Sequence, residues 1–186
     1  MTASSDRTAR IWDGTSGKEI ALLRGHDDWV KSAVFSADGS RIVTASSDGT
    51  ARVWDGTSGK EIAVLRGHES SVYSAAFSRD GSRIVTASMD RTARVWDVAS
   101  GKEIAVLRGH DSYVNSAAFS PNGSRIVTAS ADHTARIWDA HLQRMDAKGL
   151  LGQACARLAG VTELTREEMR LAGYPERMPQ IDVCKE

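Results

Sequence analysis

A repeat with a period of 42 residues is the feature that most restricts how this chain can fold. Four similar segments, TASSDRTARIWD, TASSDGTARVWD, TASMDRTARVWD and TASADHTARIWD, begin at Thr2, Thr44, Thr86 and Thr128. A Gly-His pair recurs in one register at residues 25–26, 67–68 and 109–110. Such regular self-similarity is typical of repeat proteins in which each period is one supersecondary unit.

Each period contains four short segments with strand character. Residues 30–36 (VKSAVFS) alternate apolar with small or polar side chains, as a half-buried strand does. Residues 41–46 (RIVTAS) are rich in β-branched and apolar side chains, and residues 50–55 and 60–65 follow as two more strands after glycine-containing turns. Because no stretch with helical period separates them, the pattern predicts four-stranded antiparallel sheets and excludes a parallel βαβ fold.

The Gly-His pair, the Asp before the third strand and the Trp-Asp that ends this strand resemble the WD-repeat β-propeller family over about residues 2–140. The resemblance implies an all-β fold of four-stranded blades that pack radially around a central channel. It also implies a scaffold that binds a protein or a peptide and is not an enzyme.

In that family a tetrad of His, Ser or Thr, Asp and Trp ties each blade together. The resemblance gives three such tetrads here: His26, Thr44, Asp48 and Trp54; His68, Thr86, Asp90 and Trp96; His110, Thr128, Asp132 and Trp138. Ser46, Ser88 and Ser130 lie on the same strand face as the threonines, so the hydroxyl of each tetrad stays open. A buried carboxylate needs donors and a buried indole N–H needs an acceptor, for which we expect the His ring.

Asp, His and a hydroxyl residue also form the catalytic triad of hydrolases, so a propeller hydrolase is an alternative. A hydrolase needs one exposed nucleophile beside an oxyanion hole, whereas three near-identical sets that each include Trp favour a structural role. The sequence has no phosphate-binding loop and no zinc-ligand spacing. We therefore expect no catalytic residues, no metal and no cofactor.

Differences between the repeats gather at the start of the first strand and around the turn before the third strand. In a WD-type blade both places open onto one face of the disc, so these positions are candidates for partner binding. The alternative is neutral drift of loop residues after duplication. The candidate residues are Trp29, Lys31, Ser47, Ser71, Tyr73, Met89, Tyr113, Asn115 and Ala131.

The repeats do not add up to a closed propeller of about four to eight blades. The chain carries about three and a third repeats: the end of one unit (residues 2–23), two whole blades (30–65 and 72–107) and three strands of another (114–139). Met1 occupies the position of Val43, Val85 and Val127, as an initiator codon inside a longer reading frame would.

Two interpretations of this blade number remain open. The chain is the C-terminal, recognition part of a larger bacterial signalling protein, or a truncated copy without function. Alternatively two chains associate and share strands, with residues 18–23 of one supplying the strand missing after Asp139 of the other, for about six blades.

Residues 141–186 depart from the repeat pattern. In the segment 145–160, apolar side chains fall on one helical face, and a second short helix is expected after residue 165. The tail resembles those that close large bacterial WD-repeat proteins. We expect two parts, repeats in 1–140 and a helical extension in 141–186 that either covers the last blade or docks elsewhere.

Charge and cysteine content limit the remaining functions. The 24 basic and 24 acidic residues balance, which argues against a general binder of nucleic acid or anionic membranes. Cys155 and Cys184 are isolated, which does not suggest a disulfide framework or a metal site. Without an apolar leader at its start, the sequence predicts a cytoplasmic protein.

Overall fold

The computed structural model describes residues 1–140, which form strands and turns without a helix. This confirms the all-β prediction for the repeats, whereas the predicted helical tail, 141–186, lies outside the described residues, as do Cys155 and Cys184. The strands are β1 (Thr2–Ala3), β2 (Thr8–Trp12), β3 (Glu19–Arg24), β4 (Val30–Phe35), β5 (Arg41–Ser46), β6 (Ala51–Asp55), β7 (Glu61–Leu65), β8 (Val72–Phe77), β9 (Arg83–Ser88), β10 (Ala93–Asp97), β11 (Glu103–Leu107), β12 (Val114–Phe119), β13 (Arg125–Ser130) and β14 (Ala135–Asp139).

These strands make four antiparallel sheets in chain order. The two whole blades predicted from the repeat are the four-stranded sheets β4-β5-β6-β7 and β8-β9-β10-β11. The incomplete units at either end are the three-stranded sheets β1-β2-β3 and β12-β13-β14. Local pairing follows the repeat closely: in each of the last three sheets the second strand pairs residue for residue with the third, as in Ile42 opposite Trp54.

The central strands are buried on both faces in the two whole blades. In β5 every residue from Ile42 to Ser46 is buried, and β9 shows the same pattern. One face of β5 carries Val43 and Ala45, and the other carries Ile42 and Thr44, because successive side chains of a strand alternate. We call the face with Val43 the forward face, because it points to the next sheet along the chain, and the face with Ile42 the backward face.

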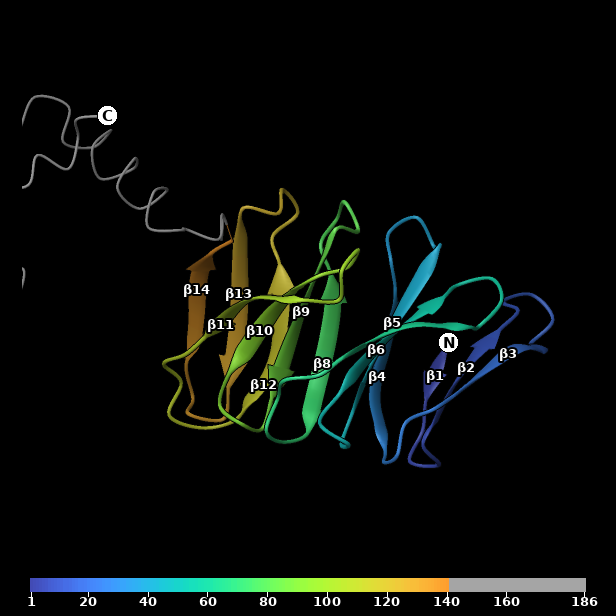
Figure 1. Cartoon of the computed structure of the whole chain (residues 1–186), viewed down its shortest axis with the longest axis horizontal. Helices are drawn as coiled ribbons and strands as arrows, with labels where there is room; N and C mark the ends of the chain where they lie inside the picture. The colour runs from blue at the N-terminus through green and yellow to red at the C-terminus, as the bar shows by residue number, and fades with distance from the viewer. Residues whose placement is uncertain (141–186) are drawn as a thin grey trace, which may run out of the picture. The chain divides into compact units, whose positions relative to one another are not determined.

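The hydrophobic cores lie between sheets, and each core joins a forward face to a backward face. Between the second and third sheets, Val43 and Val53 pack with Ile84 and Trp96. Equivalent cores join the first sheet to the second and the third to the fourth. Figure 1 shows the four sheets in a row, with β3 and β14 at opposite ends. Within residues 1–140 the blades therefore follow propeller packing without the first sheet meeting the last.

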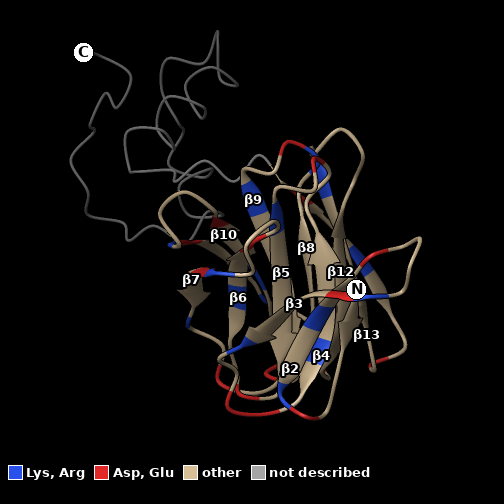
Figure 2. Ribbon diagram, turned by 90° about the vertical axis from the view of Figure 1, so that its right-hand side faces the viewer, with Lys and Arg blue, Asp and Glu red and all other residues tan. Residues whose placement is uncertain are grey.

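Charged residues are spread over residues 1–140. Figure 2 shows acidic residues mainly in the loops at the strand ends and basic residues also along the strands, with the two kinds interspersed in this view. Residues 1–140 contain no helix that is long and apolar enough to cross a membrane.

Candidate functional site

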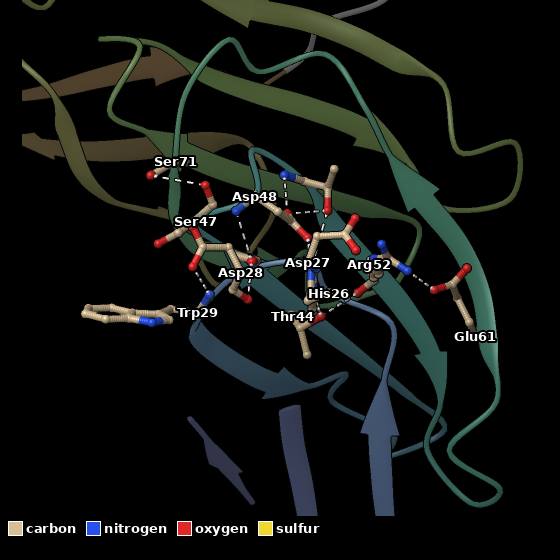
Figure 3. Close-up of polar contacts among 12 residues, drawn as sticks. His26, Asp27, Asp28, Trp29, Thr44, Ser47, Asp48, Arg52, Glu61 and Ser71 are labelled. Atoms are coloured by element: carbon tan, nitrogen blue, oxygen red, sulfur yellow. Dashed lines mark hydrogen bonds and ion pairs between the residues drawn. The ribbon is translucent and has the colours of Figure 1, made fainter. Parts of the chain in front are cut away.

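The first tetrad joins the loop before a blade to two positions inside it. His26 lies between β3 and β4, and its Nδ1 is 2.7 Å from Oδ2 of Asp48 in the β5–β6 turn. Its Nε2 is 2.7 Å from Oγ1 of Thr44 on β5, and Nε1 of Trp54 donates to the same oxygen over 2.9 Å. Figure 3 shows His26 with Asp48 and Thr44 as its polar neighbours.

The other two tetrads repeat this geometry almost without change. His68 lies 2.7 Å from Asp90 and 2.7 Å from Thr86. In the third set the corresponding distances from His110 are 2.7 Å to Asp132 and 2.8 Å to Thr128. Trp96 and Trp138 donate to their threonines over 2.9 Å. All twelve tetrad residues expected from the resemblance are thus brought together in three sets of four.

The structure decides which hydroxyl takes part. Thr44 bonds to the His ring, whereas Ser46 donates to the carbonyl of Asp28 and accepts from the backbone N–H of Asp48. Ser88 and Ser130 take the same kind of role at the equivalent turns. The serines therefore support the turn, and the threonines belong to the tetrads.

The expectation that the His ring accepts the indole N–H is wrong. The acceptor is the threonine hydroxyl, and the His26 and Trp54 ring centroids are 6.2 Å apart. The register explains the difference: Trp54 lies opposite Ile42, so Thr44, two residues further along the same face, is its diagonal cross-strand neighbour. Thr44 thereby lies between the two rings.

The hydrogen bonds of each tetrad form a continuous chain from the carboxylate to the indole. An ionised carboxylate only accepts, so Nδ1 of His26 must donate to Asp48. Nε2 of His26 lies against the Thr44 hydroxyl, whose oxygen accepts from the Trp54 indole N–H. Every polar side-chain atom of the tetrad has a hydrogen-bond partner, which buried groups require.

The tetrad aspartates are held in their charged form. Burial opposes the charge of Asp48 and by itself would raise its pKa, but hydrogen bonds from His26 and Thr50 outweigh burial and bring the pKa well below 3.8. Asp90 behaves in the same way with His68 and Thr92. The pKa of Asp132 is lowered chiefly by the Thr134 hydroxyl, with burial opposing and His110 assisting.

The tetrads have the connectivity of a hydrolase triad but not its accessibility. Thr44 and Thr86 are completely buried, and their hydroxyl oxygens already receive an indole N–H. A surface depression of about 400 Å³, lined by Arg79, Asp80 and Arg83 with the 121–123 turn, contains no tetrad residue. A substrate therefore cannot reach these hydroxyls in the folded blade, and the arrangement supports a structural role.

The candidate partner-binding residues lie at one end of the sheets and are linked in pairs. The residue before the tetrad Asp donates its backbone N–H to a carbonyl at the start of the same blade: Ser47 to Trp29 at 2.9 Å, Met89 to Ser71 at 2.9 Å, and Ala131 to Tyr113 at 3.0 Å. Two places that vary between repeats are thus joined by a hydrogen bond in each blade.

Side chains extend these pairs across neighbouring blades. Ser71 Oγ donates to the carbonyl of Ser47 over 3.3 Å, and the rings of Tyr73 and Tyr113 are 6.1 Å apart. Lys31 Nζ lies 4.7 Å from the centre of the Trp29 ring. Trp29 is 52% exposed, Met89 47% and Tyr113 41%, and Lys31 and Asn115 are exposed as well. The nine candidates therefore form a surface, which we call the variable face.

Two features of the blades were not expected from the sequence. An arginine on the third strand pairs with a glutamate on the fourth: Arg52 with Glu61 and Arg94 with Glu103, each at 2.6 Å (Figure 3 shows the first). The constant nine-residue spacing of Arg and Glu in the first three repeats is the signal that could have predicted these pairs.

The second unexpected feature concerns the residue after each Asp of the TAS segments. Arg7, Arg91 and His133 have φ of 72°, 68° and 68°, where the equivalent Gly49 has 82°. This position requires the left-handed conformation, which glycine adopts without strain. Variation there is therefore subject to a backbone constraint as well as to any constraint from binding.

Within residues 1–140, no cluster of three or more His, Cys, Asp or Glu side chains is arranged to hold a metal ion. The His and Asp side chains of the tetrads form hydrogen bonds within each tetrad.

Comparisons with known proteins agree with this architecture. A stretch of 43 residues is 44% identical to "Nuclear distribution protein PAC1" of Mycosarcoma maydis, covering 23% of this chain and 10% of that protein. "WD repeat and SOCS box-containing protein 1" of Homo sapiens is also 44% identical over 43 residues, with the same shares. The chain thus spans about a tenth of the length of these relatives. The family "WD domain, G-beta repeat" matches residues 17–55, 59–97 and 101–139, more than half of the sequence. The chain belongs to the WD40-repeat family.

Proposed function

We propose that this protein is a non-enzymatic scaffold that binds another protein or a peptide through the variable face. Support comes from the gathering of large exposed side chains, Trp29, Met89 and Tyr113, at one end of adjacent blades. Exposed aromatic and methionine side chains are enriched at the centres of protein interfaces, where they bury much area at low cost in conformational entropy.

The tetrads supply the rigidity that such a surface needs. In every blade the tetrad Asp lies next to a variable residue, since Asp48 follows Ser47 and Asp90 follows Met89. The bonds from His26 and His68 hold these turns against the loops that carry Trp29 and Ser71. Preorganised side chains lose less entropy on binding, so the same contacts give a higher affinity.

The finer assignment is recognition within a larger bacterial signalling protein. It is supported by the resemblance of residues 141–186 to tails of large bacterial WD-repeat proteins. This chain matches only about a tenth of each relative, so the specific roles of the relatives do not support the proposal. What supports it is that they belong to the same repeat family.

The proposal is tested with peptides selected from a random display library against the wild-type chain. Their affinities are then measured for a variant with Trp29, Lys31, Tyr73 and Met89 replaced by Ala. We expect at least about a hundredfold loss, because two or more central contacts of about 1.4 kcal/mol or more each are removed.

A matched control replaces four exposed residues of the outer strands and their preceding loops, Lys18, Ile20, Lys60 and Ile62, by Ala. The control should bind as the wild type does, and both variants should keep the wild-type melting temperature. Equal affinity of the variable-face variant and the wild type refutes the proposal and favours drift of these loop positions after duplication.

A further inference from the structure

The forward face of the last sheet is exposed at positions that are buried in the preceding blades. Val43 and Val53 of the second sheet and Val85 and Val95 of the third are all 0% exposed. Their equivalents in the last sheet are Val127, which is 45% exposed, and Ile137, which is 70% exposed. Ala129 and Ala135, between them on the same face, are also exposed.

The difference comes from the neighbouring sheet and not from the sequence. The forward faces of the repeats carry the same kinds of apolar residue, but within residues 1–140 a following sheet covers only the first three of the four faces. An apolar patch made of adjacent side chains on a rigid sheet is uncommon on a monomer and marks an interaction surface.

In the first three sheets the forward face is covered by the backward face of the next sheet, which carries the same repeated residues. Its central residue is the tetrad tryptophan: Trp54 packs with Ile11 of the sheet before it, and Trp96 packs with Val53. The first sheet carries the same residue, Trp12, and its Nε1 donates to Thr2 over 2.9 Å, the distance found in the tetrads. Thr2 is exposed, whereas Thr44 is completely buried.

We propose that a second copy of this chain covers the exposed face, with the forward face of the last sheet of each copy packed on the backward face of the first sheet of the other. This head-to-tail contact repeats the packing that joins the sheets within the chain. A heterologous contact either closes into a ring or grows without limit. Two copies of four sheets give eight, within the range of about four to eight blades for closed propellers.

The structure favours this contact over exchange of strands. Residues 19–24 of β3 are already paired with β2 along its length, so transfer of this strand to the edge of β14 in another copy first breaks that pairing. Packing of faces breaks no hydrogen bond. The backward face of the first sheet includes only the two-residue strand β1 beside β2 and β3, so each contact is smaller than those within the chain. We expect a dimer that dissociates on dilution.

The test is the mass of the full chain in solution, measured by light scattering and sedimentation over a range of concentrations. The wild type should shift from one to two chain masses as concentration rises. Ile137→Arg should raise the dimer dissociation constant by more than about tenfold, because it places a charge in the contact. The matched control is Ile62→Arg, at a position that is 51% exposed on β7 of an inner blade, and it should dimerise as the wild type does.

Mixing two defective variants distinguishes the head-to-tail contact from a symmetric one. Thr2→Arg disables the backward face of the first sheet and Ile137→Arg the forward face of the last. Each variant alone should be monomeric, with the melting temperature of the wild type. An equimolar mixture should regain dimers, because one intact pair of faces remains between two different copies.

The other outcomes overturn the proposal. A wild type that stays monomeric, or whose mass grows beyond two chains, contradicts the two-copy ring. Dimers that persist in Ile137→Arg point to exchange of strands, and dimers of Thr2→Arg alone point to a symmetric contact of the last sheets. Trp12→Arg, in the same backward face, gives a second measurement if Thr2→Arg alters the fold.

Discussion

Removal of one tetrad carboxylate, in Asp90→Ala, is the most direct test of how these blades are stabilised. The Asp90 carboxylate accepts four hydrogen bonds: from His68 Nδ1 at 2.7 Å, the Thr92 hydroxyl at 2.6 Å, and the backbone N–H groups of Thr92 at 2.9 Å and Glu69 at 3.1 Å. The side chains of Asp90 and His68 are only 7% and 2% exposed. The substitution therefore leaves a buried imidazole N–H without its acceptor.

The size of the effect follows from these contacts. A hydrogen bond to a charged group contributes about 1.5–3 kcal/mol, and removal of one partner of a buried pair costs about 3–5 kcal/mol. The Glu69 N–H is exposed and regains water, whereas the Thr92 N–H and the His68 ring are buried, so we expect a loss of about 3–5 kcal/mol in the free energy of unfolding. With about 2–4 °C per kcal/mol for a domain of this size, the melting temperature should fall by roughly 10 °C.

Thermal unfolding followed by circular dichroism measures this shift, and Asp97→Ala in the same sheet is the matched control. Asp97 accepts bonds from the backbone and hydroxyl of Ser100 in a solvent-exposed turn, so its removal should change the melting temperature little. The reasoning fails if the two variants melt at the same temperature, since the tetrad bonds would then contribute no more than a surface turn.

Two further predictions concern the loss of stability at low pH and the positions with positive φ. The tetrad aspartates have folded-state pKa values below the ordinary 3.8, so their contribution to stability is complete above that pH and is lost as the pH falls below it towards the folded-state values. Melting temperatures between pH 7 and pH 2 should show a steep loss in acid that is weaker in Asp90→Ala, and equal slopes would contradict the assignment. Arg91→Gly should stabilise the chain and Gly49→Arg should destabilise it, each by about 1 kcal/mol in urea unfolding, because both positions have positive φ. A loss of stability in both variants would show that side-chain contacts outweigh backbone strain there.

Much of the local structure could be predicted from the sequence. The strands expected at residues 30–36, 41–46, 50–55 and 60–65 are found at Val30–Phe35, Arg41–Ser46, Ala51–Asp55 and Glu61–Leu65. This agreement has a physical reason: alternation of apolar side chains and glycine-containing turns specify strands and hairpins over a few residues, and the repeat supplies the same information several times.

The partners of the polar groups were harder to predict. The sequence favoured Thr44 for the hydroxyl but left Ser46 as an alternative on the same face, and the indole N–H of Trp54 was assigned to the wrong acceptor. Both choices depend on the register of β5 against β6, which places Thr44 beside the indole and directs Ser46 to the turn. Differences of one residue in register decide such contacts, and composition does not reveal them.

The sequence by itself determined the repeat, the strands and the residue types of each tetrad, because these depend on interactions within one period. Only the tertiary structure decided which repeated residues are covered. Val53 and Ile137 occupy the same position of the repeat, yet one is completely buried and the other is 70% exposed. Burial depends on the sheet that packs against a strand, and that neighbour lies outside the period that encodes the strand.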